Sequence, residues 1–217
     1  RQWSRGLGDV YKRQGKNREG TIEGNRNFAS KLGLEIIAVD LKQTHSIKGK
    51  ELEIISSQTI RKLIQDGQLN IANSLLGRNW CITGVVEQGK QQGREIGFPT
   101  ANLDIKKFLK PPLGVYVTRL KITDQKELET SNDWLPSISN IGTRPTVSGD
   151  SINLETHVID LNNEDLNINL YGKRIKVELL EFLRSETKFN SLSELKKQIE
   201  LDTKMAYDFQ KLKSLKL

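Results

Sequence analysis

The sequence has few of the features that mark an exported or membrane-embedded protein. Its 217 residues include a single cysteine, Cys81, so no disulfide can form within the chain. No apolar run approaches the roughly 18 residues of a membrane span, and no signal-peptide pattern is present at the start. With 35% apolar and 28% charged residues, the composition is typical of a globular protein. We therefore expect a cytoplasmic protein without a membrane partner.

Aromatic residues are scarce at 6%, and excess positive charge is scarce outside two terminal segments. The net charge of +7 alone would suggest a nucleic-acid partner. However, residues 1–14 hold four basic side chains against Asp9, and residues 204–217 hold four against Asp208. A nearly neutral body without aromatic platforms disfavours an oligonucleotide-binding barrel, so we expect no nucleic-acid partner. The sequence leaves the oligomeric state open.

The first 75 residues divide into two segments. Residues 1–14 have no apolar period and no helix cap, and we interpret them as a non-native leader. Residues 15–75 predict a helix over 25–32, a buried strand over 34–39, a helix that begins after Ser56 or Ser57, and a helix over 71–76. One convincing strand cannot make a parallel sheet, so we predict that residues 15–75 are the remnant of an α/β domain.

Residues 76–217 predict a mainly β domain. Short β-like runs separated by turn residues cover 80–87, 115–122, 137–141, 154–161 and 174–182. The last run alternates most clearly, because Ile175, Val177 and Leu179 fall on one side while Lys176 and Glu178 fall on the other. Five or six such strands favour an antiparallel barrel.

A helix is predicted to close the chain. Ser191 and Glu194 form a capping box. Apolar residues then recur near helical period, with one interruption at Asp202. The predicted stripe consists of Leu192, Leu195, Ile199, Met205, Phe209 and Leu212. We expect this helix to pack on the barrel.

The stretch from Gly89 to Asn102 contains a candidate polyphosphate site. Glycines let the backbone approach phosphate oxygens, and Lys90 or Arg94 can offset their charge. The Thr100 hydroxyl and the Asn102 amide carbonyl, two residues apart on an extended segment, can supply oxygen ligands to Mg²⁺ from one side. The glycines alone are better explained as a flexible hairpin tip, and Pro-Thr-Ala-Asn as an ordinary turn.

The uninterrupted run Gly97-Phe98-Pro99-Thr100-Ala101-Asn102 resembles the nucleotide-binding hallmark of riboflavin kinases. Two further motifs follow in the order of that family, Asn140-Ile141-Gly142-x-x-Pro145-Thr146 and Glu155-x-His157. The resemblance implies a six-stranded antiparallel Greek-key barrel with a C-terminal helix. It also implies transfer of the ATP γ-phosphate to the 5′-hydroxyl of riboflavin, forming FMN.

The resemblance also implies which residues bind the nucleotide and its metal. ATP is the co-substrate, and Thr100 and Asn102 are the expected ligands of Mg²⁺. The residues expected to bind ATP are Gly89, Lys90, Gly93, Arg94, Gly97, Pro99, Thr100 and Asn102.

The reaction needs a group that accepts a proton. A primary alcohol loses its proton as it attacks phosphorus, and a carboxylate within hydrogen-bond reach can accept it. The resemblance makes Glu155 this general base, whereas a strand glutamate by itself would be read as a surface residue. His157 shares the strand face of Glu155, and we assign it no catalytic role. Arg144 fits a ligand contact or a solvated charge equally well.

The segment from Tyr171 to Phe189 resembles the part of the family that closes the flavin site. Arg184 and Glu186 are expected to hold polar atoms of the flavin, and Phe189 to pack against its ring. The alternative is that Phe189 belongs to the core and the two charges to the surface.

A second family resemblance covers the front of the chain. The run Ile55-Ser56-Ser57-Gln58-Thr59-Ile60-Arg61 resembles a motif of FMN adenylyltransferases, although Gln58 replaces the usual threonine. The histidine-bearing nucleotidyl-transfer motif of that family does not occur in these residues, so we expect no FAD synthesis. The alternative function for the whole chain is a non-catalytic flavin-binding β-barrel, which would need no magnesium site opposite a base.

Overall fold

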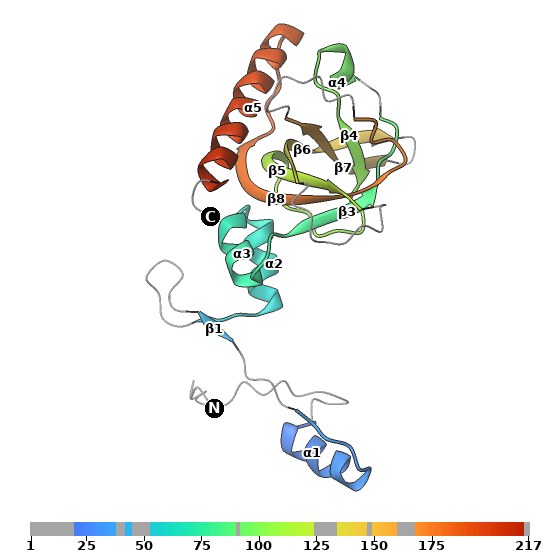
Figure 1. Ribbon diagram of the computed structural model, residues 1–217, viewed down its shortest axis with the longest axis vertical. Coiled ribbons are helices and arrows are strands. Elements are labelled where there is room, and N and C mark those ends of the chain that lie inside the picture. Colours follow the sequence, from blue (N-terminus) through green and yellow to red (C-terminus); the bar gives the residue numbers. More distant parts are fainter. Residues whose placement is uncertain are drawn as a thin grey trace. The chain divides into compact units, whose positions relative to one another are not determined.

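The computed structural model describes residues 20–37, 42–44, 53–89, 92–123, 134–146, 149–159 and 168–214 (Figure 1). The interpreted leader and Lys90 lie outside these residues. The chain divides into two compact units, Arg1–Gln43 and Thr44–Leu217.

The first unit contains helix α1 (Ile22–Lys31), which confirms the predicted helix. Its N-cap is Thr21, whose hydroxyl accepts a hydrogen bond of 3.0 Å from the backbone N–H of Gly24. Residues 34–37 of the predicted strand 34–39 are not in a strand, and residues 38–39 lie outside the described residues. The prediction of an α/β remnant therefore stays a prediction.

Two short helices precede the barrel in the second unit. Strands β1 (Gln43–Thr44) and β2 (Glu53–Ile54) pair with each other before them. Helix α2 (Ser57–Gln65) begins at Ser56, whose hydroxyl accepts from the N–H of Thr59 at 3.1 Å. Helix α3 (Leu69–Leu76) ends at Gly77, which has a left-handed φ of 68°. Both predicted helices are confirmed.

Six antiparallel strands form the barrel, with the short helix α4 (Gln92–Glu95) between the first two. The strands are β3 (Cys81–Val85), β4 (Ala101–Asp104), β5 (Gly114–Ile122), β6 (Leu135–Thr146), β7 (Gly149–Val158) and β8 (Arg174–Ser185). Their order is β3-β8-β5-β6-β7-β4, and a bond of 2.9 Å from the N–H of Glu87 to the carbonyl of Asn102 joins the two edges.

This order confirms the predicted Greek-key barrel. Strands β5, β6 and β7 are consecutive neighbours, and β4, which precedes them in the chain, lies beside β7. The five predicted strand runs correspond to β3, β5, β6, β7 and β8. The sixth strand, β4, contains the Ala101-Asn102 end of the hallmark run, which was read from the sequence only as an extended segment.

Two faces of the sheet bury different side chains. Leu103, Leu154 and Ile141 occupy one register row across β4, β7 and β6, and all three belong to the main core. Residues next to them in sequence point to the opposite face. On that face Val115 and Ile138 pack with Ala206 of the C-terminal helix in a second cluster.

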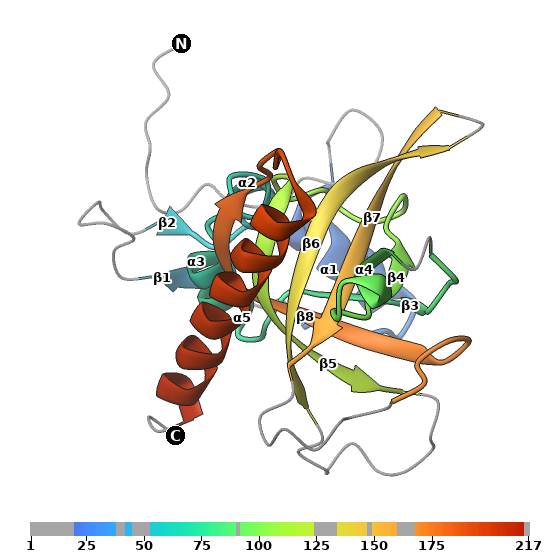
Figure 2. The ribbon, with the colours of Figure 1, turned by 90° about the horizontal axis from the view of Figure 1, so that it is seen from above.

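The C-terminal helix α5 (Leu192–Ser214) lies along β5 and β6 (Figure 2). Its start confirms the capping box, since the N–H of Glu194 donates to the Ser191 hydroxyl at 3.2 Å. The predicted apolar stripe is partly wrong, because Leu192, Met205 and Leu212 are exposed. Asp202, read as an interruption, is buried instead.

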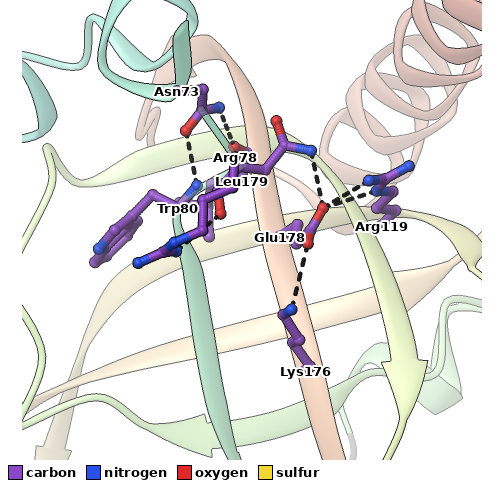
Figure 3. Close-up of polar contacts among 8 residues, drawn as sticks. Asn73, Arg78, Trp80, Arg119, Lys176, Glu178 and Leu179 are labelled. Atoms are coloured by element: carbon purple, nitrogen blue, oxygen red, sulfur yellow. Dashed lines mark hydrogen bonds and ion pairs between the residues drawn. The ribbon is translucent and has the colours of Figure 1, made fainter. Parts of the chain in front are cut away.

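Helix α3 is joined to the barrel by polar contacts (Figure 3). The Asn73 amide donates to the carbonyl of Leu179 at 2.9 Å and accepts from the N–H of Trp80 at 2.7 Å. Next to them, the buried carboxylate of Glu178 pairs with Arg119 at 2.8 Å. The alternating strand pattern put Glu178 on the correct face, but its burial comes from contacts that only the fold provides.

Candidate active site

The predicted metal ligands and the predicted base lie on one face of the sheet. Asn102 of β4 is directly opposite Glu155 of β7, and Glu155 is directly opposite Asn140 of β6. Directly opposite residues on antiparallel strands have Cβ atoms about 4.5 to 5.5 Å apart. The register therefore aligns an amide, a carboxylate and a second amide across three neighbouring strands.

A cleft opens at the end of the barrel where β4 begins and β7 ends. Its volume is about 900 Å³, and it lies next to the row that contains Glu155. Four residues predicted to bind ATP line it: Arg94, Gly97, Pro99 and Thr100. Residues of β7 and of the segment before β8 also line it, among them Thr156, His157, Val158, Ile168, Leu170 and Tyr171. Basic, backbone and apolar surfaces in one cleft suit a nucleotide.

The segment from Gly93 to Pro99 is folded back on itself. The N–H of Phe98 donates to the carbonyl of Gly93 at 2.7 Å, and the N–H of Gly97 donates to the carbonyl of Arg94 at 3.2 Å. A Cβ on Gly93 would collide with the Phe98 carbonyl, and Gly97 has a φ of 91° that favours glycine. Two of the predicted glycines are therefore required by the shape of this loop.

The Asn102 amide is packed against the backbone of Gly89. A Cβ on Gly89 would lie 2.5 Å from Nδ2 of Asn102 and 3.0 Å from Oδ1. Asn102 is only 6% exposed, so its amide has little freedom to rotate. Gly89 therefore contributes by leaving room for the amide, a role that differs from the phosphate contact expected of it.

The residues present fit the magnesium ion that the family resemblance implies. Thr100 and Asn102 lie two apart at the start of β4 and offer a hydroxyl and an amide oxygen on one side. Among the described residues, no group of three or more His, Cys, Asp or Glu side chains could hold a metal by itself. Two neutral oxygens suit an ion whose other ligands are phosphate oxygens and water.

His157 connects the cleft loop to the sheet. Its Nδ1 lies 2.9 Å from the carbonyl oxygen of Pro99, and its ring meets the Phe98 ring edge-on at 5.3 Å. Burial lowers the pKa of His157 from its usual value near 6.5, while the bond to Pro99 acts in the opposite direction. The sequence motif contained this histidine, but its partner depends on the pairing of β4 with β7.

Of the three predicted flavin residues, Arg184 lies near the end of β8, and Glu186 and Phe189 follow that strand. Arg184 donates to both carboxylate oxygens of Asp202, with the shortest bond at 2.7 Å. Its guanidinium carbon lies 5.9 Å from the Phe189 ring. Oε1 of Glu186 accepts from the Asn140 amide at 3.3 Å. Glu186 thus extends the row of Asn140 and Glu155, whereas Arg184 faces α5.

Asn140 was present in a family motif but was not predicted as a site residue. A Cβ on Gly142 would collide with Glu186, so the Gly142 position also lets that carboxylate approach the sheet. Alternation along β6 was the signal that could have placed Asn140 beside Glu155, once the register of β6 against β7 is known.

No helix within the described residues has the length and apolar character needed to cross a membrane.

The chain resembles the crystal structure of a protein from Streptococcus pneumoniae named a macrolide-efflux protein, with a TM-score of 0.69 and 29% identity. That match covers 91% of this chain and 58% of the other.

Similar sequences include bifunctional riboflavin kinase/FMN adenylyltransferases. The protein of this name from Escherichia coli K12 is 37% identical over 187 residues, which cover 86% of this chain and 55% of the relative. The one from Bacillus subtilis 168 is 39% identical over 153 residues, covering 70% and 45% respectively. The chain thus spans about half the length of the curated relatives that it matches.

The model of the riboflavin kinase (flavokinase) family matches residues 76–210, which include every strand of the barrel and most of α5. The hallmark run, the Asn140 row and the C-terminal helix all fall within this match. The chain belongs to the riboflavin kinase family.

Proposed function

We propose that the chain transfers the γ-phosphate of ATP to the 5′-hydroxyl of riboflavin and so forms FMN. The observation that carries the proposal is the register of Asn102 opposite Glu155 and of Glu155 opposite Asn140. This row links the cleft lined by Thr100 and Arg94 to the contact between Asn140 and Glu186. An acceptor alcohol beside Glu155 then lies between a nucleotide side and a flavin side.

The nucleotide side holds the triphosphate. Arg94 supplies positive charge, and backbone N–H groups of the glycine segment supply hydrogen-bond donors. The Thr100 hydroxyl and the Asn102 carbonyl would hold Mg²⁺, which when bound neutralises charge on the phosphates. Gly89 keeps the Asn102 amide in place, because any side chain there would displace it.

Glu155 acts as the general base. Its carboxylate accepts the proton of the riboflavin 5′-hydroxyl as the oxygen attacks the γ-phosphorus, and ADP leaves. Because phosphoryl transfer has a loose transition state, the main contribution of the protein is to hold the two reactants in line. The opposed positions of Asn102 and Glu155 support this arrangement.

The flavin side is formed by Glu186 and Asn140, with Phe189 as a ring contact. Arg184 is proposed to act there through its position beside Phe189, because its guanidinium hydrogen bonds go to Asp202 and the Ser185 carbonyl. The carboxylate of Glu186, exposed and held by Asn140, is available to hydroxyl groups of a ribityl chain.

The test is the product formed from riboflavin, ATP and Mg²⁺. We expect FMN and ADP in equal amounts, separated by chromatography. A protein that retains riboflavin without forming FMN would be the non-catalytic flavin-binding barrel, and the proposal would be wrong. The same assay supplied with FMN and ATP should yield no FAD, since the nucleotidyl-transfer histidine motif does not occur in these 217 residues.

A further inference from the structure

His157 is a conspicuous polar residue of the cleft that the proposed chemistry does not use. It lines the cleft together with Thr100 and Arg94, yet the proton acceptor is Glu155 and the metal ligands are on β4. Thr156 pairs with Ala101 in the register of β7 and β4, so His157 lies level with Thr100, at the point where β4 begins. Its position is therefore next to the residue expected to hold the metal.

The contacts of His157 hold the segment that leads into β4. Its Nδ1 is 2.9 Å from the Pro99 carbonyl oxygen. A carbonyl oxygen can only accept, so Nδ1 must carry the proton and donate it. Phe98 adds an edge-on ring contact at 5.3 Å. Two consecutive residues before Thr100 are thus fixed to β7 by one side chain.

Among the described residues, the other backbone hydrogen bonds of this loop are internal, so a contact with the sheet has to come from a side chain such as His157. The bonds between Phe98 and Gly93 and between Gly97 and Arg94 define its shape. They do not fix its distance from the sheet. Proline at position 99 stiffens the chain after the attachment, so the direction of Thr100 follows from where the Pro99 carbonyl is held.

We propose that His157 is a positioning residue for the nucleotide: through its Nδ1–H bond to the Pro99 carbonyl it sets the Thr100 hydroxyl at the metal-triphosphate site. The inference rests on the proposed function, because it assumes that the cleft holds a nucleotide. In this role His157 does not contact the reacting atoms. Specificity for the magnesium-nucleotide complex is thus assigned to a side chain outside the metal ligands.

The variants His157→Asn, His157→Gln and His157→Leu separate this role from a packing role. The Asn side chain can place an N–H donor near the position of Nδ1, whereas Gln places its donor one bond further from the backbone. Both are amides of similar polarity, so they form a matched pair. Leu retains apolar bulk and removes the donor.

Binding of Mg-ADP, measured by calorimetry, is the first measurement, since it does not require turnover. We expect affinity to fall about tenfold in the Leu and Gln variants, as for loss of a hydrogen bond in a partly buried site, and to be largely rescued in the Asn variant. In FMN formation, KM for Mg-ATP should rise by a similar factor while KM for riboflavin stays unchanged.

Equal losses of Mg-ADP affinity in the Asn and Gln variants would overturn the inference. A fall in kcat with an unchanged KM for Mg-ATP would also overturn it. If the Leu variant fails to fold, the two amide variants decide alone. If the wild-type chain binds Mg-ADP but forms no FMN, the proposed function fails, and the order of Mg-ADP affinities still decides the positioning role.

Discussion

At the residue scale, some glycines matter because the absence of a side chain leaves room for a neighbouring functional group. Gly89 does not have a left-handed φ, so alanine is compatible with its backbone. A Cβ there would nevertheless lie 2.5 Å from Nδ2 of Asn102. The effect of a substitution at this position should therefore come from the displaced amide.

We predict that Gly89→Ala raises KM for Mg-ATP about tenfold by moving the Asn102 amide. The double variant Gly89→Ala/Asn102→Ala should be no worse than Asn102→Ala alone, because the clash is then gone. Steady-state kinetics of the three variants measure this coupling. Additive effects of the two substitutions would show that Gly89 acts independently of Asn102.

A pH prediction concerns His157. The pKa of His157 is lowered in the folded chain, so the unfolded chain binds the proton more readily. We therefore predict that the free energy of unfolding decreases as the pH falls below about 6.5, the pKa of a histidine in the unfolded chain. The chain has only two histidines, so proton NMR titration with a His45→Gln variant assigns the signals. We expect His157 to titrate below 6.5 in the absence of nucleotide. A value at or above 6.5 would contradict its burial.

The sequence predicted the hallmark residues better than it predicted their partners. Gly97, Thr100 and Asn102 belong to a short continuous run, so their grouping needed no fold. The contact of His157 with Pro99 joins residues 58 apart and required the register of β4 against β7. The ion pair between Arg184 and Asp202 could not be predicted for the same reason, since the sequence assigned Arg184 to the flavin and showed Asp202 only as an interruption of the apolar stripe.

At the element scale, helix α5 is held by a buried ion pair within a largely polar helix. Asp202 is 2% exposed and accepts from Arg184 and from the Gln198 amide. The apolar stripe could not reveal this, because a charge in the stripe reads as a break in it. Figure 2 shows the helix beside β6. Its apolar contact with β5 and β6 is made by Ala206, which packs with Val115 and Ile138.

We predict that Arg184→Met lowers the free energy of unfolding by about 3 kcal/mol, because it leaves the buried Asp202 carboxylate without its cation. Asp202→Ala should cost less, since the freed Arg184 is partly exposed and can reach water. Asp208→Ala, at an exposed site on the same helix, is the control and should change stability by about 0.5 kcal/mol or less. Urea unfolding measures all three, and equal stability of Arg184→Met and the control would contradict the account.

At the scale of the whole molecule, helices α2 and α3 share the hydrophobic core of the barrel. Ile64, Leu69 and Ala72 belong to the same buried cluster as the barrel strands. The sequence suggested a domain boundary after residue 75, where the composition changes from helical to β. Composition changes where the secondary structure changes, whereas the extent of a hydrophobic core is set by packing. The start of the β-rich sequence at residue 76 therefore need not be the start of the unit that shares this core.

A fragment that begins at residue 53 should therefore be more stable than one that begins at residue 76. The shorter fragment loses the burial of Ile64 and Leu69 together with the Asn73 contacts to Leu179 and Trp80. We expect a difference of about 3 to 6 kcal/mol in the free energy of unfolding, from burial of two large side chains. Equal stabilities would support the boundary after residue 75.

The central claim is that the barrel brings the metal-triphosphate site and one carboxylate to the same reacting hydroxyl. The most direct measurement is single-turnover phosphoryl transfer by Glu155→Gln, together with its affinity for Mg-ADP. Glu200→Gln, at an exposed site on α5, serves as the matched control. We predict that Glu155→Gln loses about a hundredfold or more in the rate of FMN formation while it binds Mg-ADP as the wild type does. A rate within about threefold of the wild type would exclude Glu155 as the general base and contradict the account.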